Sequence, residues 1–154
     1  MTTGEMLPSR STWDDWARAL AERTAAVDRL VEATAAAELS AGPAEHSAVL
    51  AVGGYGRREL FPCSDVDLLL LFDSAEHAQA SREAIERFLR ALWDAGLRVS
   101  HSVRTPLECA EIHENNLELN ISLLDERYLA GGRELGFGRG GIREVGHRHV
   151  PTRV

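Results

Sequence analysis

The stretch AVLAVGGYGRRELFPCSDVDLLLLF, residues 48–72, decides the fold. Its first five residues are apolar and run directly into Gly53 and Gly54, and it ends in a nearly continuous apolar run over 66–72. Short apolar runs bounded by glycine or loop residues are typical of buried strands, and a run without alternation indicates a strand covered on both faces. The stretch therefore predicts two buried strands, joined by a glycine-rich loop that carries two aspartates.

Patterns on either side of this stretch predict helices and a third strand. The expected elements are, in order, a helix over 13–37, strands over 48–52 and 66–72, a helix over 75–95, a strand over 97–103, a helix opened by Pro106 and a helical segment over 117–129. We expect Trp13 and Trp16 to anchor the first helix by packing. This order predicts an α+β or α/β fold, a small mixed sheet with helices packed on it and an N-terminal helix.

The chain of 154 residues suits one domain. We expect a leader over 1–12, the folded domain over 13–135 and a Gly/Arg-rich tail over 136–154 that is poorly ordered or belongs to a longer protein. The net charge of −7 argues against direct DNA binding and against attachment to an anionic membrane. Cys63 and Cys109 form no metal or disulfide pattern and are expected to be buried or half-buried, which favours a cytoplasmic location.

Asp65 and Asp67 flank one valine at the start of the second strand. Side chains at i and i+2 of a strand lie on one face, roughly 7 Å apart. Two carboxylates so placed can share a pair of magnesium ions about 3.5–4 Å apart. The simpler alternative is a solvated Asp-x-Asp at a strand mouth, but Asp67 directly precedes four leucines, where an unpaired carboxylate is costly.

The loop before the aspartates has features of a phosphate site. Gly53 and Gly54 let the backbone approach a ligand closely, although glycines after strands are also common at plain turns. Arg57 and Arg58 are natural phosphate ligands, and one of them is expected to pair with Glu59 or a surface acid instead. The combination of a buried strand, two glycines and Asp-x-Asp indicates a phosphate and metal site more specifically than any one of these features does.

The combined motif resembles the Gly-Gly…Asp-x-Asp signature of the DNA polymerase β-like nucleotidyltransferase superfamily. Within it, the chain resembles the bacterial PII uridylyltransferase/uridylyl-removing enzyme family over about residues 48–132. The segments that carry this resemblance are Gly53-Gly54-Tyr55-Gly56-Arg57, Glu59-Leu60, Ser64 to Leu68, Leu92-Trp93-Asp94, Gly96-Leu97, His101 to Thr105, Leu123-Leu124, Arg127 and Leu129-Ala130-Gly131.

The resemblance implies magnesium-dependent transfer of UMP from UTP to a tyrosine of a small PII-type nitrogen-regulatory protein. It implies that Asp65 and Asp67 hold the metals, that Gly53 and Gly54 bracket the triphosphate, and that Ser64 supports the loop. The resemblance also implies that Arg104 holds phosphate or the loop. Arg104 is thus a candidate phosphate ligand in addition to Arg57. The family's phosphohydrolase and glutamine-sensing domains do not fit in 154 residues.

One position departs from the family pattern. The third metal carboxylate is expected eleven residues before Arg127, and that position is Asn116. An amide oxygen is a weaker magnesium ligand because it carries no charge, so Asn116 is the candidate third ligand with Glu114 and Glu118 nearby. Two alternatives stay open: a nucleotidyltransferase of other base or acceptor specificity, such as adenylyl transfer, and a catalytically degenerate nucleotide-binding or regulatory domain.

Overall fold

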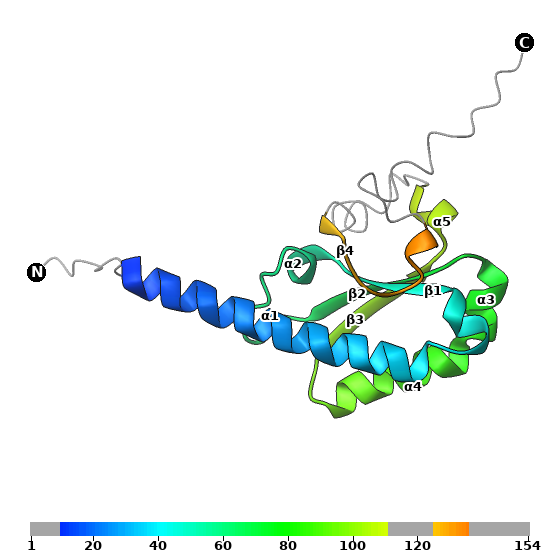
Figure 1. Cartoon of the computed structure of the whole chain (residues 1–154), viewed down its shortest axis with the longest axis horizontal. Helices are drawn as coiled ribbons and strands as arrows, with labels where there is room; N and C mark the ends of the chain where they lie inside the picture. The colour runs from blue at the N-terminus through cyan, green and yellow to red at the C-terminus, as the bar shows by residue number, and fades with distance from the viewer. Residues whose placement is uncertain (1–9, 111–124, 136–154) are drawn as a thin grey trace, which may run out of the picture.

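A four-stranded mixed sheet forms the centre of the molecule. The computed structural model describes residues 10–110 and 125–135. The strands are β1 (Ser47–Ala51), β2 (Val66–Phe72), β3 (Val99–Arg104) and β4 (Arg127–Gly131), in the order β3-β2-β1-β4 (Figure 1). β1 pairs antiparallel with β2 and β4, whereas β2 pairs parallel with β3. The two central strands are the two apolar runs of the sequence, and both are buried almost throughout.

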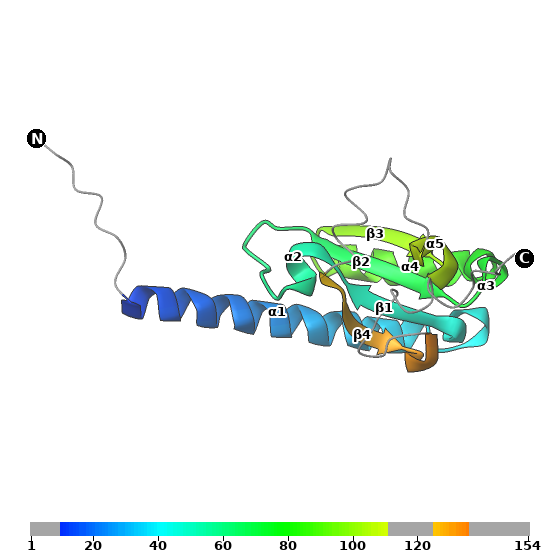
Figure 2. The ribbon, with the colours of Figure 1, turned by 90° about the horizontal axis from the view of Figure 1, so that it is seen from above.

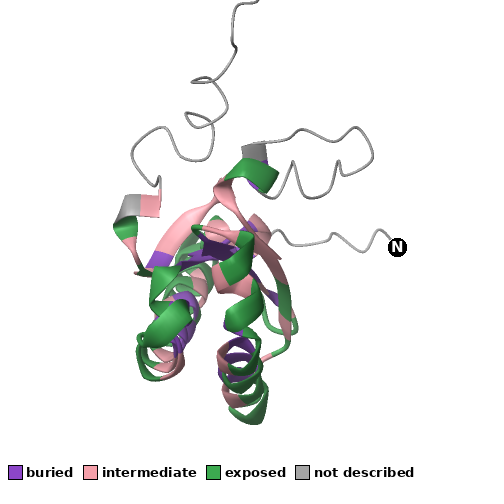
Figure 3. Cartoon of the chain, turned by 90° about the vertical axis from the view of Figure 1, so that its right-hand side faces the viewer, coloured by how far each residue is buried: buried purple, intermediate pink, exposed green. Residues whose placement is uncertain are grey.

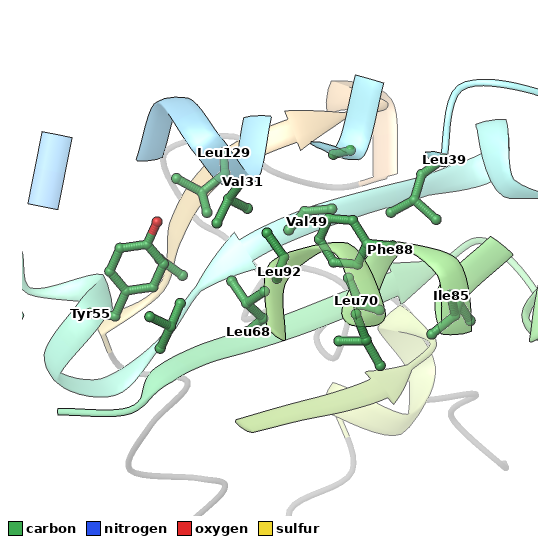
Figure 4. Close-up of a cluster of buried hydrophobic side chains, with 14 of the residues drawn as sticks. Val31, Leu39, Val49, Tyr55, Leu68, Leu70, Ile85, Phe88, Leu92 and Leu129 are labelled. Atoms are coloured by element: carbon green, nitrogen blue, oxygen red, sulfur yellow. The ribbon is translucent and has the colours of Figure 1, made fainter. Parts of the chain in front are cut away.

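Two long helices cover one face of this sheet. α1 (Arg10–Glu38) and α4 (Arg82–Asp94) turn their buried residues toward the sheet and their exposed residues outward (Figure 3). The core between them and the strands is apolar (Figure 4). Its members include Val31, Leu39, Val49, Tyr55, Leu68, Leu70, Ile85, Phe88, Leu92 and Leu129.

The opposite face of the sheet is covered more thinly. Alternate residues of the central strands, among them Leu50, Leu69 and Leu71, pack with Cys109 of α5 (Pro106–Ala110) in a second apolar cluster. The side-chain period of two places Asp67 on this face with Leu69 and Leu71, away from α1 and α4. The expected fold class, a small mixed sheet with packed helices and an N-terminal helix, is confirmed.

Several element boundaries differ from the expectation. α1 begins at Arg10, inside the expected leader, and its first turns extend past the sheet (Figures 1 and 2). Trp13 and Trp16 are 59% and 56% exposed there, so the packing role expected for them is wrong within the described residues. The expected helix over 75–95 is two helices, α3 (Ala75–Ala80) and α4, separated at Ser81.

The prediction of a helical segment over 117–129 is wrong for its last residues. Residues 127–131 form β4, because the free edge of β1 supplies the backbone partners and because Leu129 is buried against the core. Residues 117–124 of that segment, like Asn116 and the tail over 136–154, lie outside the described residues. Cys109 is buried as expected, whereas Cys63 is exposed.

No helix within 10–110 or 125–135 has both the length and the apolar character needed to cross a bilayer.

Candidate functional site

A tight glycine turn follows β1. The turn is the short helix α2 (Gly53–Gly56), and Val52 before it is held by a 3.1 Å backbone hydrogen bond to the carbonyl of Asp67. Gly53 has a φ of 58°, a conformation that favours glycine. A Cβ at Gly53 would lie 3.3 Å from Oδ2 of Asp67, so a side chain there would crowd this carboxylate. The turn and the carboxylate therefore lie in direct contact.

The two aspartates lie where β2 begins. Asp67 pairs with Ser100 in the parallel register of β2 and β3. Burial raises the pKa of Asp67, the negative charge of Asp65 raises it further, and a hydrogen bond with Ser100 lowers it. Asp65 is half-exposed, and one of its oxygens lies 3.3 Å from Nε of Arg98. The pair is thus a site of concentrated negative charge that a cation would stabilise.

Arg57 lies beside the glycine turn. Its Nε is 3.1 Å from a Glu59 oxygen and its Nη1 is 2.8 Å from an Asp125 oxygen. Its Nη2 would be 3.8 Å from a Cβ at Gly54, which places the guanidinium against the turn. The expectation that one of the two arginines pairs with Glu59 is met by Arg57. A phosphate bound by Arg57 would have to share its guanidinium with these two acids.

Ser64 and Arg104 lie in different parts of the molecule. Ser64 precedes Asp65, and its N–H donates to the carbonyl of Phe61 over 3.0 Å, which closes the loop before β2. Arg104 pairs with Leu71, four residues beyond the Asp67–Ser100 pair, or about 13 Å along the strands. Arg104 lies on the same face of the sheet as Asp67, and within the described residues its Nε is buried without a hydrogen-bond partner. The structure does not bring Arg104 to the aspartates.

A largely buried ion pair supports the turn from the side of α1 and β4. Arg127 of β4 donates from Nη1 and Nη2 to the two oxygens of Asp28, over 2.8 and 3.0 Å. The same guanidinium donates to the carbonyls of Tyr55 and Gly56 over 3.2 and 3.3 Å. Arg127 therefore ties the glycine turn to α1 and β4.

Sequence reasoning missed two of these supporting residues, Asp28 and Asp125. Asp125 carries no local signal, since it lies 68 positions from Arg57. Asp28 does carry a local signal, because it is an acid that lies between Val27 and Val31 on the buried side of α1. An acid on the buried side of a helix is costly unless it is paired or hydrogen-bonded, so it indicates a partner from elsewhere in the chain. Position 116, the candidate third ligand, lies outside the described residues.

The chain is similar in sequence to a family of nucleotidyltransferases and to several bacterial enzymes. The family model described as "Putative nucleotidyltransferase DUF294" matches residues 2–102. The bifunctional uridylyltransferase/uridylyl-removing enzyme of Pseudomonas entomophila (strain L48) is 56% identical over 88 residues, which are 57% of this chain and 10% of that enzyme. The enzymes of the same name from Pseudomonas putida strains W619 and F1 are 44% and 45% identical over 133 residues, 86% of this chain.

The chain thus spans about 10–15% of the length of these relatives. No solved structure matches the chain.

Proposed function

Since this chain belongs to the nucleotidyltransferase family DUF294, we propose that it catalyses magnesium-dependent transfer of a nucleotidyl group at the Asp65/Asp67 pair. One observation supports this site above the others: the glycine turn at Gly53 lies against the carboxylate of Asp67. A phosphate approached by the backbone of the turn would therefore lie next to the carboxylates. Neither feature alone carries this argument, because glycine turns and Asp-x-Asp pairs are both common.

The residues present fit a divalent cation. Magnesium prefers oxygen ligands, and Asp65 and Asp67 offer two carboxylates whose negative charges repel each other. Among the described residues, the exposed Arg98 pairs with Asp65. Burial and the like charge of Asp65 both raise the pKa of Asp67, and a bound cation would offset both effects. Asp65 and Asp67 would hold the metal, and Asn116 is the proposed third ligand. When bound, magnesium would neutralise charge on the phosphates and on the attacking oxygen.

The protein's own residues would position the reactants. Gly53 and Gly54 would admit the triphosphate close to the backbone, while Arg57, oriented by Glu59 and Asp125, would hold a phosphate oxygen. Ser64 would support the loop that carries Asp65. An acceptor hydroxyl would attack the α-phosphorus in line with the departing pyrophosphate. Arg104, about 13 Å away on the same face, would reach only a distant part of a bound ligand.

The choice of UTP and of a protein acceptor rests on the relatives. Their printed name describes uridylyl transfer and removal, and they are 44–56% identical to this chain over the matched residues. We therefore propose UTP as the nucleotide and a hydroxyl of a PII-type regulatory protein as the acceptor. The uridylyl-removing half of the name is not assigned to this chain, which spans 10–15% of those enzymes.

A nucleotide-binding domain without activity is the second candidate. The position beside Asp67 on the neighbouring strand is Ser100, which is not a carboxylate, and position 116 is Asn. Two metals held by only two carboxylates are held weakly. In this alternative the domain would bind nucleotide with magnesium and show no turnover.

Calorimetric titration of UTP, ATP, GTP and CTP, each with and without magnesium, tests the proposal. We expect magnesium-dependent binding with UTP favoured, and weaker binding by the Asp65→Asn variant. Asp94→Asn is the matched control, since Asp94 is an exposed carboxylate at the end of α4. Equal binding by Asp65→Asn and the control would contradict the site. Binding without any pyrophosphate release in the presence of an acceptor protein would favour the second candidate.

A further inference from the structure

A cluster of two histidines and one aspartate lies at the other end of the sheet. His46 ends the 3₁₀ turn η1 (Gly42–His46) before β1, Asp73 follows β2, and His77 lies in α3. The Nδ1 atom of His77 is 2.5 Å from one oxygen of Asp73, and Nδ1 of His46 is 3.4 Å from the other. The two imidazole rings stack in parallel, with centroids 4.2 Å apart. Three side chains from three segments thus converge on one point.

The backbone around the cluster is fixed by short-range hydrogen bonds. The N–H of Asp73 donates to the carbonyl of His46 over 3.2 Å, which joins two of the three segments. Ser74 caps α3 by accepting a hydrogen bond from the N–H of His77, and the Ser47 hydroxyl donates to the carbonyl of Ala44 over 2.6 Å. The three side chains are therefore held on a scaffold that needs no rearrangement of the chain to present them together.

The donor set is that of a transition-metal site. One ligand atom from each of the three side chains lies within 4.8 Å of the others. Two imidazoles and a carboxylate suit zinc, cobalt, nickel or copper, whereas magnesium prefers oxygen ligands alone. All three side chains are partly exposed, so water can complete the coordination.

This cluster is separate from the nucleotide site. Asp73 lies six residues beyond Asp67 along β2, which corresponds to about 20 Å. In Figures 1 and 2, α2 and α3 lie at opposite ends of the sheet. A metal bound here would not contact the Asp65/Asp67 pair.

We propose that His46, Asp73 and His77 form a binding site for a divalent transition-metal ion, of which zinc is the reference case. Binding would replace the hydrogen bond between His77 and Asp73, and the contact between His46 and Asp73, by bonds to the metal. Oε1 of Glu45 lies 3.7 Å from Nε2 of His46, so this carboxylate is a further candidate ligand. The site would link η1, β2 and α3, so an occupied site would stabilise this end of the sheet.

Titration of the whole chain with zinc chloride, followed by calorimetry and thermal unfolding, tests the site. Cobalt chloride serves as a spectroscopic probe, because imidazole ligation changes its visible absorption. We expect one equivalent to bind, and the His77→Gln and Asp73→Asn variants to bind at least about tenfold more weakly. Magnesium chloride at the same concentration should leave this end of the molecule unchanged.

Three of the four other histidines provide the controls. His101 lies in β3, and His147 and His149 form a His-x-His pair in the tail. The His101→Gln and His147→Gln/His149→Gln variants should retain the cobalt spectrum and the affinity for zinc. The proposal is overturned if zinc fails to bind, or if the His46→Gln/His77→Gln variant binds as the unmodified chain does. Circular dichroism of each metal-free variant verifies that it is folded before titration.

Discussion

Replacement of Arg127 by alanine should destabilise the domain by about 3 kcal/mol. The change removes both hydrogen bonds to Asp28 and leaves a carboxylate that is only 13% exposed without its main partner. Breaking a buried pair from one side costs about 3–5 kcal/mol. The lower end applies here, because Nη1 of Arg58 lies 3.9 Å from Asp28 and partly replaces the lost charge.

Urea unfolding followed by circular dichroism measures this loss. A destabilisation of about 3 kcal/mol corresponds to a decrease in Tm of roughly 6–12 °C for a chain of this size. Arg90→Ala, at an exposed position of α4, is the control and should change stability by less than about 0.5 kcal/mol. The Asp28→Ala/Arg127→Ala variant should lose less than the sum of the two single losses. A loss below about 1 kcal/mol for Arg127→Ala would refute the reasoning.

Three further predictions concern the site and the cysteines. Gly53→Ala should weaken magnesium-dependent nucleotide binding in calorimetry more than it lowers Tm, because the new methyl group crowds Asp67; a change in Tm alone would count against this. Asp67→Asn should raise the Tm of the metal-free protein at neutral pH, since a raised folded-state pKa means that stability is lost as pH rises through it. The gain should vanish at a pH low enough to protonate Asp67, and a decrease in Tm at pH 7 would be the contrary result. With a thiol reagent, exposed Cys63 should react at once and Cys109 only on unfolding, because burial raises the Cys109 pKa to about 11; equal rates would contradict this.

The two central strands were predictable from the sequence. β2 is a continuous apolar run, and only a strand buried on both faces accommodates such a run without exposing leucines. The shared face of Asp65 and Asp67 stays a prediction from the strand period of two, because the structure has Asp67 within β2 and Asp65 directly before it. These features depend on local sequence alone.

The edge strand and the supporting ion pair were not predictable in this way. β4 has the sequence Arg-Tyr-Leu-Ala-Gly, which is compatible with a helix, and it becomes a strand only because β1 offers it an unpaired edge. The partners Asp28 and Arg127 lie 99 positions apart, beyond the reach of any periodic pattern. The break at Ser81 was not predicted either; there the Ser81 hydroxyl donates to the carbonyl of His77.

The late position of β4 has a consequence for synthesis on the ribosome. β1 is complete at Ala51, but its second neighbour ends only at Gly131, 80 positions later. At a translation rate of 5–20 residues per second, the edge of β1 that pairs with β4 stays unpaired for roughly 4–16 s. An unpaired strand edge is a template for association with other chains. During this interval a chaperone that binds exposed strand edges would protect the growing polypeptide from such association.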